Sequence, residues 1–335
     1  MTNLRIDVFP HIYPKALFER LDKIRPAYTG SPNIAARPAL VDLDARFRMM
    51  DRYPNYVQIL TLSQPPLEDF AQGQAAADLA QLANDGMAEL VRTHPDRFLG
   101  FGAAVALDDV DLALREVDRA VNQLGALGVQ IYTNTQGHPL DEPRFEPFFA
   151  YLAELGKVIW IHPTRNEDHP DYPTETTSKY ALYFKLGWPY ETSVCISRLI
   201  FSGIVSRYPT LKFLTHHAGG IIPHLAGRLT LRHESPDQRK AIGVADEFTP
   251  DRTLDAYRSF YGDTVFSGAH HPLDCALAFF GADHILFGTD MPYGAEGGEE
   301  FVRETIAAVE QVDISEAERQ ALWDGNARAL LGLPT

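Results

Sequence analysis

Short runs of apolar, β-branched and aromatic residues recur along the chain and alternate with longer amphipathic stretches. Several of the short runs, such as VIWIH at 158–162, contain almost no polar residue, which is typical of parallel strands that are covered on both faces. Amphipathic patterns predict long helical stretches at residues 67–94 and 143–156. The short runs predict eight strands, at residues 4–9, 56–62, 98–104, 128–133, 158–162, 212–217, 259–266 and 284–290.

Strands that alternate with helices define the α/β class, and eight of them predict a (β/α)8 TIM barrel. The alternative is an open, doubly wound sheet, but no glycine-rich phosphate-binding turn follows any predicted strand. No stretch has the composition of a linker, so we expect residues 1–335 to form a single barrel domain. Polar, proline-rich segments at 24–40, 163–180 and 291–300 follow predicted strands, and such loops gather at the catalytic face of a barrel.

Composition excludes several classes of partner. The net charge of −15 argues against nucleic acid and against an anionic membrane. No apolar run approaches the roughly 18 residues of a membrane span, and the polar N-terminus leads into a strand, so we expect no signal or transit peptide. The two cysteines, Cys195 and Cys275, form no metal-binding pattern. We expect both to be buried thiols in a reducing compartment, which makes the cytoplasm the predicted location.

Histidine and aspartate residues fall at the ends of several predicted strands. His11 follows the first strand, His162 ends the fifth, His216 and His217 end the sixth, and Asp290 ends the eighth. The carboxyl ends of barrel strands carry the catalytic groups of such enzymes. Imidazole and carboxylate are ligands that suit Zn²⁺, and also Mn²⁺ where oxygen donors are more numerous. The placement therefore predicts a metal site that keeps a position open for water or substrate.

Several segments occur in the order in which one known family carries them. They are IDVFPHIYP (6–14), VIWIHPT (158–164), GWPYETSVCISRLIFSGIVSRYPTLKFLTHHAGGIIPHLAGR (187–228), ILFGTDMPYG (285–294) and GNARALLGL (325–333). With these motifs the chain resembles the amidohydrolase superfamily, in the branch of aminocarboxymuconate-semialdehyde decarboxylase and the hydroxybenzoate-type decarboxylases. The likeness runs from residue 4 to about residue 333.

The resemblance implies roles for the strand-end residues. His11, His162 and Asp290 match metal ligands, and the aspartate also handles protons. His217 matches the histidine that hydrogen-bonds the metal-bound water or the substrate, so Asp290 and His217 are the expected catalytic residues. Its neighbour His216 should point the other way along the strand and have a structural role.

The resemblance also implies residues that contact the substrate. Arg228, in HLAGR, matches an arginine that reaches a substrate carboxylate across a subunit boundary, and the alternative is a salt bridge on a helix surface. His270, in GAHHP, matches a loop position that can face the pocket. Phe184, Trp188 and Tyr293 lie near loops that could wall an apolar pocket, and ordinary core packing is the alternative. We expect a homodimer that binds a small carboxylic acid.

Phe9 departs from the family pattern. Relatives carry His at this position, or Glu in the hydroxybenzoate decarboxylases, whereas a phenyl ring cannot bind a metal. Residues two apart share one face of a strand, so Phe9 should still point near the site. Pro10 cannot donate to a strand ladder, which indicates that the strand ends there.

We expect the metal to be retained despite this departure. His11, His162 and Asp290 with a water would form a normal catalytic set. One alternative is a metal-free site, as in one lactonase branch of the family, where His and Asp act as acid and base. Another is that Asp7 replaces the missing ligand, although its family match is a structural aspartate.

The function implied by the resemblance is non-oxidative decarboxylation of a small aromatic or dienoic carboxylic acid. One Zn²⁺, or Mn²⁺ or Mg²⁺, per chain would orient the substrate. Asp290, with His217 or a bound water, would then protonate the ring carbon as carbon dioxide leaves. The alternative is a metal-dependent hydrolase of a lactone or amide, or a hydratase, because these enzymes share the same motifs.

Overall fold

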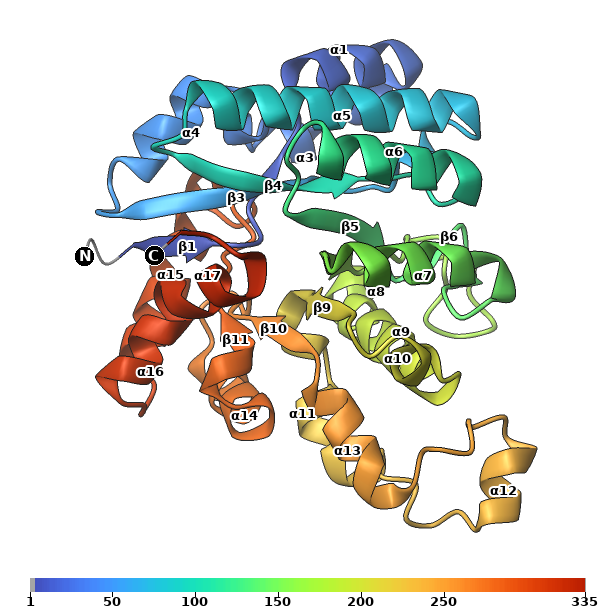
Figure 1. Ribbon diagram of the computed structural model, residues 1–335. Helices are drawn as coiled ribbons and strands as arrows, with labels where there is room; N and C mark the ends of the chain where they lie inside the picture. The colour runs from blue at the N-terminus through green and yellow to red at the C-terminus, as the bar shows by residue number, and fades with distance from the viewer. Residues whose placement is uncertain (1–3, 335) are drawn as a thin grey trace.

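The computed structural model describes residues 4–334, in which strands alternate with helices. Eight strands lie side by side in chain order, and all pair in parallel (Figure 1). A further strand, β2 (His11–Ile12), follows the first after a short break and pairs with β3. The eight strands are β1 (Arg5–Asp7), β3 (Tyr56–Leu62), β4 (Phe98–Ala104), β5 (Gly128–Tyr132), β8 (Val158–His162), β9 (Lys212–Thr215), β10 (Tyr261–Asp263) and β11 (Ile285–Leu286).

The first and last strands meet through backbone hydrogen bonds. The N–H of Val8 donates to the carbonyl oxygen of Phe287 at 3.0 Å, and the N–H of His11 donates to that of Met291 at 2.6 Å. These bonds bring the sheet round to a nearly closed barrel. The predicted TIM barrel is therefore confirmed, and the alternative of an open, doubly wound sheet is wrong.

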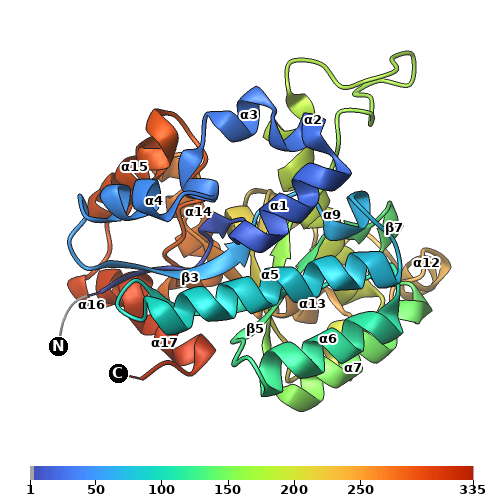
Figure 2. The ribbon, with the colours of Figure 1, turned by 90° about the horizontal axis from the view of Figure 1, so that it is seen from above.

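Helices surround the barrel, and in Figure 2 α1 and α5 lie across the face nearest the viewer. Asn84 joins α5 to β4, because its side-chain amide both donates to the carbonyl and accepts from the N–H of Ala104. The helices are α1 (Lys15–Ile24), α2 (Pro26–Thr29), α3 (Pro32–Ala35), α4 (Leu43–Met50), α5 (Gln74–Thr93), α6 (Val110–Asn122), α7 (Glu146–Leu155), α8 (Leu182–Lys185), α9 (Gly187–Phe201), α10 (Ile204–Arg207), α11 (Ile222–Leu225), α12 (Pro236–Ala241), α13 (Pro250–Arg258), α14 (His270–Phe280), α15 (Glu299–Gln311), α16 (Glu316–Gln320) and α17 (Asn326–Leu331).

Several predicted elements are shorter than expected. The stretch 67–94 begins with the 3-10 turn Leu67–Asp69, and the helix proper starts only after Gly73, whose φ of 54° does not fit a helix. The stretch 143–156 likewise begins with the 3-10 turn Pro143–Phe145. The segment that contains α12 lies far from the barrel in Figure 1, and the loop at 163–180 extends outward in Figure 2. Within the described part of the chain, none of the helices has the length and apolarity to cross a membrane.

An apolar cluster formed mainly by strand residues lies beneath the polar strand ends. Trp160 is fully buried in it and donates from its indole N–H to the carbonyl oxygen of Val8 at 3.0 Å. Gly128 leaves room for this indole, because a Cβ at that position would lie 2.7 Å from the ring and 2.1 Å from the carbonyl oxygen of Val158. Phe9 belongs to the same cluster. The packed interior leaves the carboxyl ends of the strands as the place for chemistry.

Candidate metal centre and active site

Two overlapping groups of metal-ligand side chains lie at the carboxyl ends of the strands. The donor atoms of His11, His162 and His216 all lie within 4.8 Å of one another. The donor atoms of His216, His217 and Asp290 form a second group of the same size. The imidazoles of the first group are almost completely buried. His216 belongs to both groups and so stands at the centre of the cluster.

The three histidines of the first group are held in the same way. The Nδ1 atom of His11 lies 3.3 Å from the carbonyl oxygen of Leu62, and that of His162 lies 2.7 Å from its neighbour's carbonyl oxygen. The Nδ1 atom of His216 lies 2.6 Å from Oδ2 of Asp263. When Nδ1 of a neutral imidazole donates its hydrogen to an oxygen, the lone pair of Nε2 is left free to bind a metal. Metal-binding histidines are usually oriented in this way.

The free nitrogens converge on Asp290. Its Oδ1 atom lies 3.1 Å from Nε2 of His11 and 3.6 Å from Nε2 of His216. Neither nitrogen is aligned for a hydrogen bond with any residue in the described range 4–334. Donor atoms that share one tetrahedral ion lie roughly 3.3–3.6 Å apart when each is about 2.0–2.2 Å from it. Buried, unpaired nitrogens at this spacing therefore fit a divalent cation.

The electrostatics of the cluster agree with that fit. Burial disfavours the Asp290 carboxylate, but His11 and His216 beside it hold the pKa of Asp290 well below its usual range. Burial and the neighbouring histidines lower the pKa of His162 well below its usual value. These two groups are therefore in the forms that bind metals, an ionised carboxylate and a neutral imidazole.

The two adjacent histidines differ in protonation. Burial, followed by the charge of His216, lowers the pKa of His217 to about 3. For His216, burial acts in the same direction, but the carboxylates of Asp263 and Asp290 outweigh it and raise its pKa to about 9. Two carboxylates thus favour positive charge at the position of His216. A metal cation next to its Nε2 would meet the same attraction.

The prediction that His216 points away from the site is wrong. Leu214 pairs with Trp160 across β9 and β8, so the next residues on that face are His216 and His162. Their rings stack with centroids 5.0 Å apart. His217 still reaches the cluster because β9 ends at Thr215 and the backbone of His217 turns into the left-handed region, with φ at 55°. Both histidines therefore face the site.

Phe9 points toward the cluster, as predicted. Its ring lies against that of His216, with centroids 4.3 Å apart, and 6.4 Å from that of His11. Asp7 does not join them. Its carboxylate accepts from the backbone N–H groups of Phe9 and Thr289 and from the hydroxyls of Tyr56 and Thr289. These bonds hold β1 to the end of the eighth strand, so the alternative that Asp7 replaces the missing ligand is wrong.

Aromatic rings surround the histidines. Tyr293 meets the ring of His11 edge-on at 5.6 Å, and Trp188 meets that of His162 at 5.5 Å. Phe184 packs on Trp188 and is partly exposed. Tyr132 was not singled out from the sequence, yet it pairs in register with His162 and lies 5.5 Å from its ring. Its hydroxyl is buried and has no hydrogen-bond partner within residues 4–334.

Two predicted substrate residues lie outside the cluster. Arg228 is exposed at the end of the 3-10 turn Ala226–Arg228. His270 is exposed at the start of α14, where it groups with His271 and Asp274 rather than with the buried histidines. Within residues 4–334 of the single chain, nothing brings either residue to the candidate metal site, and their roles remain predictions.

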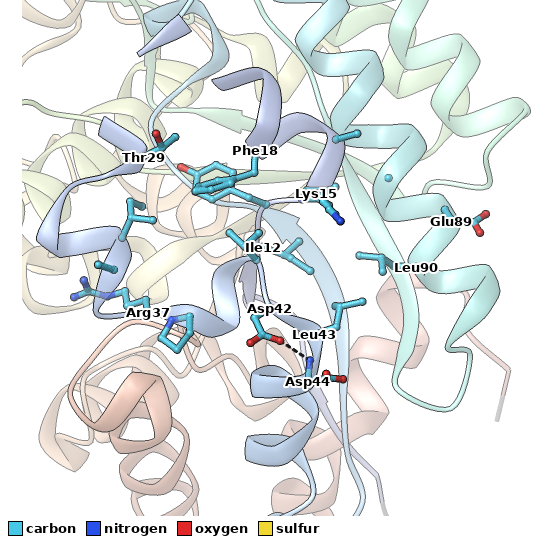
Figure 3. Close-up of a pocket in the computed structure, with 18 residues that line it drawn as sticks. Ile12, Lys15, Phe18, Thr29, Arg37, Asp42, Leu43, Asp44, Glu89 and Leu90 are labelled. Carbon is cyan, nitrogen blue, oxygen red and sulfur yellow. Dashed lines mark hydrogen bonds between the residues drawn. The ribbon is translucent and has the colours of Figure 1, made fainter. Parts of the chain in front are cut away.

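A cavity of about 820 Å³ lies beside the site but does not include it (Figure 3). Ile12 lines this cavity, whereas its neighbour His11 faces the cluster. Arg37 also lines it, and its guanidinium lies 4.9 Å from the centre of the Tyr293 ring. Asp42, drawn in Figure 3, accepts from the N–H of Asp44 and caps α4. Its acidic side chain therefore has a structural task.

Comparisons with known proteins agree with this architecture. The family profile described as Amidohydrolase matches residues 6–333, so the chain belongs to the amidohydrolase family. It is 32% identical to a gamma-resorcylate decarboxylase of Polaromonas sp., over 89% of this chain and 90% of the relative. It is 29% identical to the 2-amino-3-carboxymuconate-6-semialdehyde decarboxylase of Dictyostelium discoideum, over 87% of this chain and 77% of the relative.

Solved structures of decarboxylases share the fold. A dihydroxybenzoic acid decarboxylase from Polaromonas sp., with bound manganese and the inhibitor 2-nitroresorcinol, superposes with a TM-score of 0.80 at 27% identity, covering 98% of this chain and 97% of that one. A 2,6-dihydroxybenzoate decarboxylase in complex with 2,6-dihydroxybenzoate gives a TM-score of 0.78 at 25% identity and covers 99% of each chain. The relatives are thus carboxy-lyases, and one of them holds manganese.

Proposed function

We propose that this protein is a metal-dependent, non-oxidative decarboxylase of a small aromatic carboxylic acid. The observation that carries the proposal is the buried cluster, in which free imidazole nitrogens converge on an ionised carboxylate at the strand ends. The named relatives are decarboxylases of that class of acid. His11, His162 and Asp290 would hold one divalent ion per chain. The ion predicted from the sequence was Zn²⁺, or Mn²⁺ or Mg²⁺, and the manganese of the Polaromonas structure supports Mn²⁺ as a candidate beside Zn²⁺.

A bound ion would supply Lewis-acid polarisation of a substrate carboxylate or of a hydroxyl next to it. The residues of the chain would then deliver a proton to the ring carbon. Decarboxylation breaks the bond between the ring and the carboxylate, and the electron pair left on the ring carbon must gain a proton. Asp290 is ionised at rest, so it would relay a proton from water or from a substrate hydroxyl rather than store one. His217, which is neutral and next to it, would hold that water or hydroxyl in place.

The aromatic side chains support an aromatic substrate. Tyr293, Trp188 and Tyr132 flank the histidines with edge-on rings. Such a wall packs well against a flat ring and excludes water from the reacting carbon. The hydroxyl of Tyr132 would remain available to a polar substituent of the substrate.

We further infer a homodimer in which Arg228 reaches the site of its partner. Its exposure in the single chain leaves it free to do so. The apolar side chains Tyr190, Ile221 and Ile242 are exposed in the same region, next to a cavity of about 530 Å³ that each of them lines. Both cysteines are free, Cys195 buried and Cys275 partly buried, which is in keeping with the proposed cytoplasmic location.

The proposal is tested with metal-loaded protein and a panel of acids that includes 2,6-dihydroxybenzoate and 6-methylsalicylate. We expect release of carbon dioxide and, in deuterated water, one deuterium on the carbon that carried the carboxylate. Hydrolysis of lactones or amides without release of carbon dioxide from any acid would instead favour the hydrolase alternative and overturn the proposal.

A further inference from the structure

We propose that His216 is itself a metal ligand and takes the place that Phe9 leaves open on the first strand. This inference rests on the proposed metal site. It adds a fourth protein ligand to the three predicted from the sequence. It also assigns different tasks to two adjacent histidines. His216 would bind the ion, and His217 would remain free to hold the water or hydroxyl that delivers the proton.

The first argument is position. Phe9 is completely buried and its ring packs on that of His216, at an angle of 32°. A phenyl ring offers no lone pair, so His11 is the one donor that the pair of residues 9 and 11 gives to the site. The imidazole packed against Phe9 supplies another donor from the residue that follows β9. The loss of a ligand at residue 9 and the gain of one at residue 216 therefore concern the same region of the site.

The second argument is orientation. The carboxylate of Asp263 is fully buried, and its Oδ1 atom accepts from the backbone N–H groups of Ala218 and Val265, both at 3.1 Å. Its Oδ2 atom is thereby fixed for the bond to Nδ1 of His216. A carboxylate that holds the far nitrogen of a histidine is the common second shell of zinc sites. The arrangement sets the ring so that Nε2 points into the cluster.

The third argument is the free atom. Nε2 of His216 is buried, has no aligned hydrogen-bond partner within residues 4–334, and lies with the donor atoms of His11 and His162 inside 4.8 Å. A buried polar atom without a partner is costly and calls for an explanation. His217 differs, because its unpaired atom is Nδ1 and it groups with His216 and Asp290 but not with His11 and His162. An ion held by the three-histidine group would therefore give Nε2 of His216 its partner without using His217.

The experiment counts imidazoles on the metal. Metal-free protein is loaded with one equivalent of Zn²⁺, and X-ray absorption at the zinc edge reports the number of histidine ligands. We expect three in the wild type, two in His216→Ala and three in His217→Ala. Chelator competition should show Zn²⁺ affinity reduced by about 100-fold or more in His216→Ala, since even second-shell changes cost about 10- to 100-fold, and nearly unchanged in His217→Ala.

Further variants keep the test decisive. His216→Asn is used if the alanine variant does not fold, as judged by circular dichroism. Asp263→Asn should keep three imidazoles but weaken Zn²⁺ binding by about tenfold, because it acts only by positioning. Two imidazoles in the wild type, with the affinity unchanged by His216→Ala, would overturn the inference and leave the proposed metal enzyme standing. A wild type that releases carbon dioxide with no metal bound would instead defeat the metal dependence of the proposed function.

Discussion

The phenyl ring of Phe9 packs against the imidazole of His216 in a tilted arrangement, with centroids 4.3 Å apart and planes inclined by 32°. The two residues lie just past the ends of β1 and β9, the first and sixth strands of the barrel, and are far apart in the sequence. One is the departure from the family's strand-1 motif, and the other is a histidine that the family match left without a chemical role. Because the two side chains are in contact, the missing ligand at Phe9 and the additional histidine at His216 belong to the same part of the site.

Phe9→His should tighten metal binding by about tenfold, because a second imidazole would enter the strand-1 side of the site. The gain should be larger in a His216→Ala background, since the two positions serve the same region. Chromogenic-chelator competition measures both effects. Phe9→Leu is the control, because it keeps the position apolar and should leave affinity unchanged. If Phe9→His has no effect in either background, residue 9 does not face the ion.

The sequence predicted the barrel well because its central strands are long, apolar and bounded by turn residues. The predictions for β3, β4 and β8 match the structure at both ends. The strands at 259–266 and 284–290 are much shorter than expected, since β10 and β11 cover only 261–263 and 285–286. Buried apolar residues such as Val265 and Phe287 continue beyond the last paired residues, so hydrophobicity does not mark where strand pairing stops.

The same limit explains the error at His216. In β9, Phe213 and Leu214 are both apolar and both buried, because a parallel strand is covered on either face. Alternation therefore cannot tell which of them points into the barrel. Only the register with β8 decides it, and that register places Leu214 beside Trp160. A left-handed turn at His217 brings the second histidine into the site as well. The sequence does not predict this turn at His217, because the glycines that favour such a conformation come only later in HHAGG.

Asp290→Asn and His217→Ala should each reduce turnover by about 10²- to 10⁴-fold, the usual cost of losing a positioned proton-transfer group. Asparagine cannot carry the proton, and alanine cannot hold the water or hydroxyl that delivers it. Steady-state rates with metal-saturated protein measure the loss, and circular dichroism confirms the fold. His138→Ala, an exposed change on β7 (His138–Pro139), is the control. Near-normal turnover in either variant would reject the role assigned to that residue.

Removal of the metal should abolish activity. The purified protein should contain about one divalent ion per chain, and dialysis against a chelator should remove ion and activity together. Re-addition of Mn²⁺ or Zn²⁺ should restore turnover. His271→Ala serves as a control in elemental analysis, because the exposed group of His270, His271 and Asp274 could retain extra metal on the surface. Full activity of protein freed of metal would contradict the prediction.

Glu68 should make the stability of the protein depend on pH. Burial raises the pKa of its carboxyl from 4.5 to about 7, so the folded state keeps a proton that the unfolded chain releases. The free energy of unfolding should therefore decrease as pH rises through this range, by about 3 kcal/mol for a shift of this size. Above the folded-state pKa the decrease should level off.

Glu68→Gln isolates this contribution, since glutamine does not ionise. Urea unfolding at about pH 5 and about pH 8 should show that the wild type loses more stability than the variant over this interval. Glu19→Gln, an exposed change on α1, should follow the wild type. Parallel pH profiles for the wild type and Glu68→Gln would mean that the carboxyl of Glu68 is not kept protonated by the fold.

Arg228→Ala should weaken substrate binding by roughly 2 to 5 kcal/mol if the guanidinium pairs with a substrate carboxylate inside the partner's site. Arg228→Lys should recover little, because lysine lacks the planar fork that holds two oxygens. The decisive measurement mixes Arg228→Ala with Asp290→Asn after separate purification and subunit exchange. In a mixed dimer, one site lacks both groups and the other is intact, so an equal mixture should regain about a quarter of the wild-type sites. If mass spectrometry confirms exchange and no activity returns, Arg228 does not act across the subunit boundary.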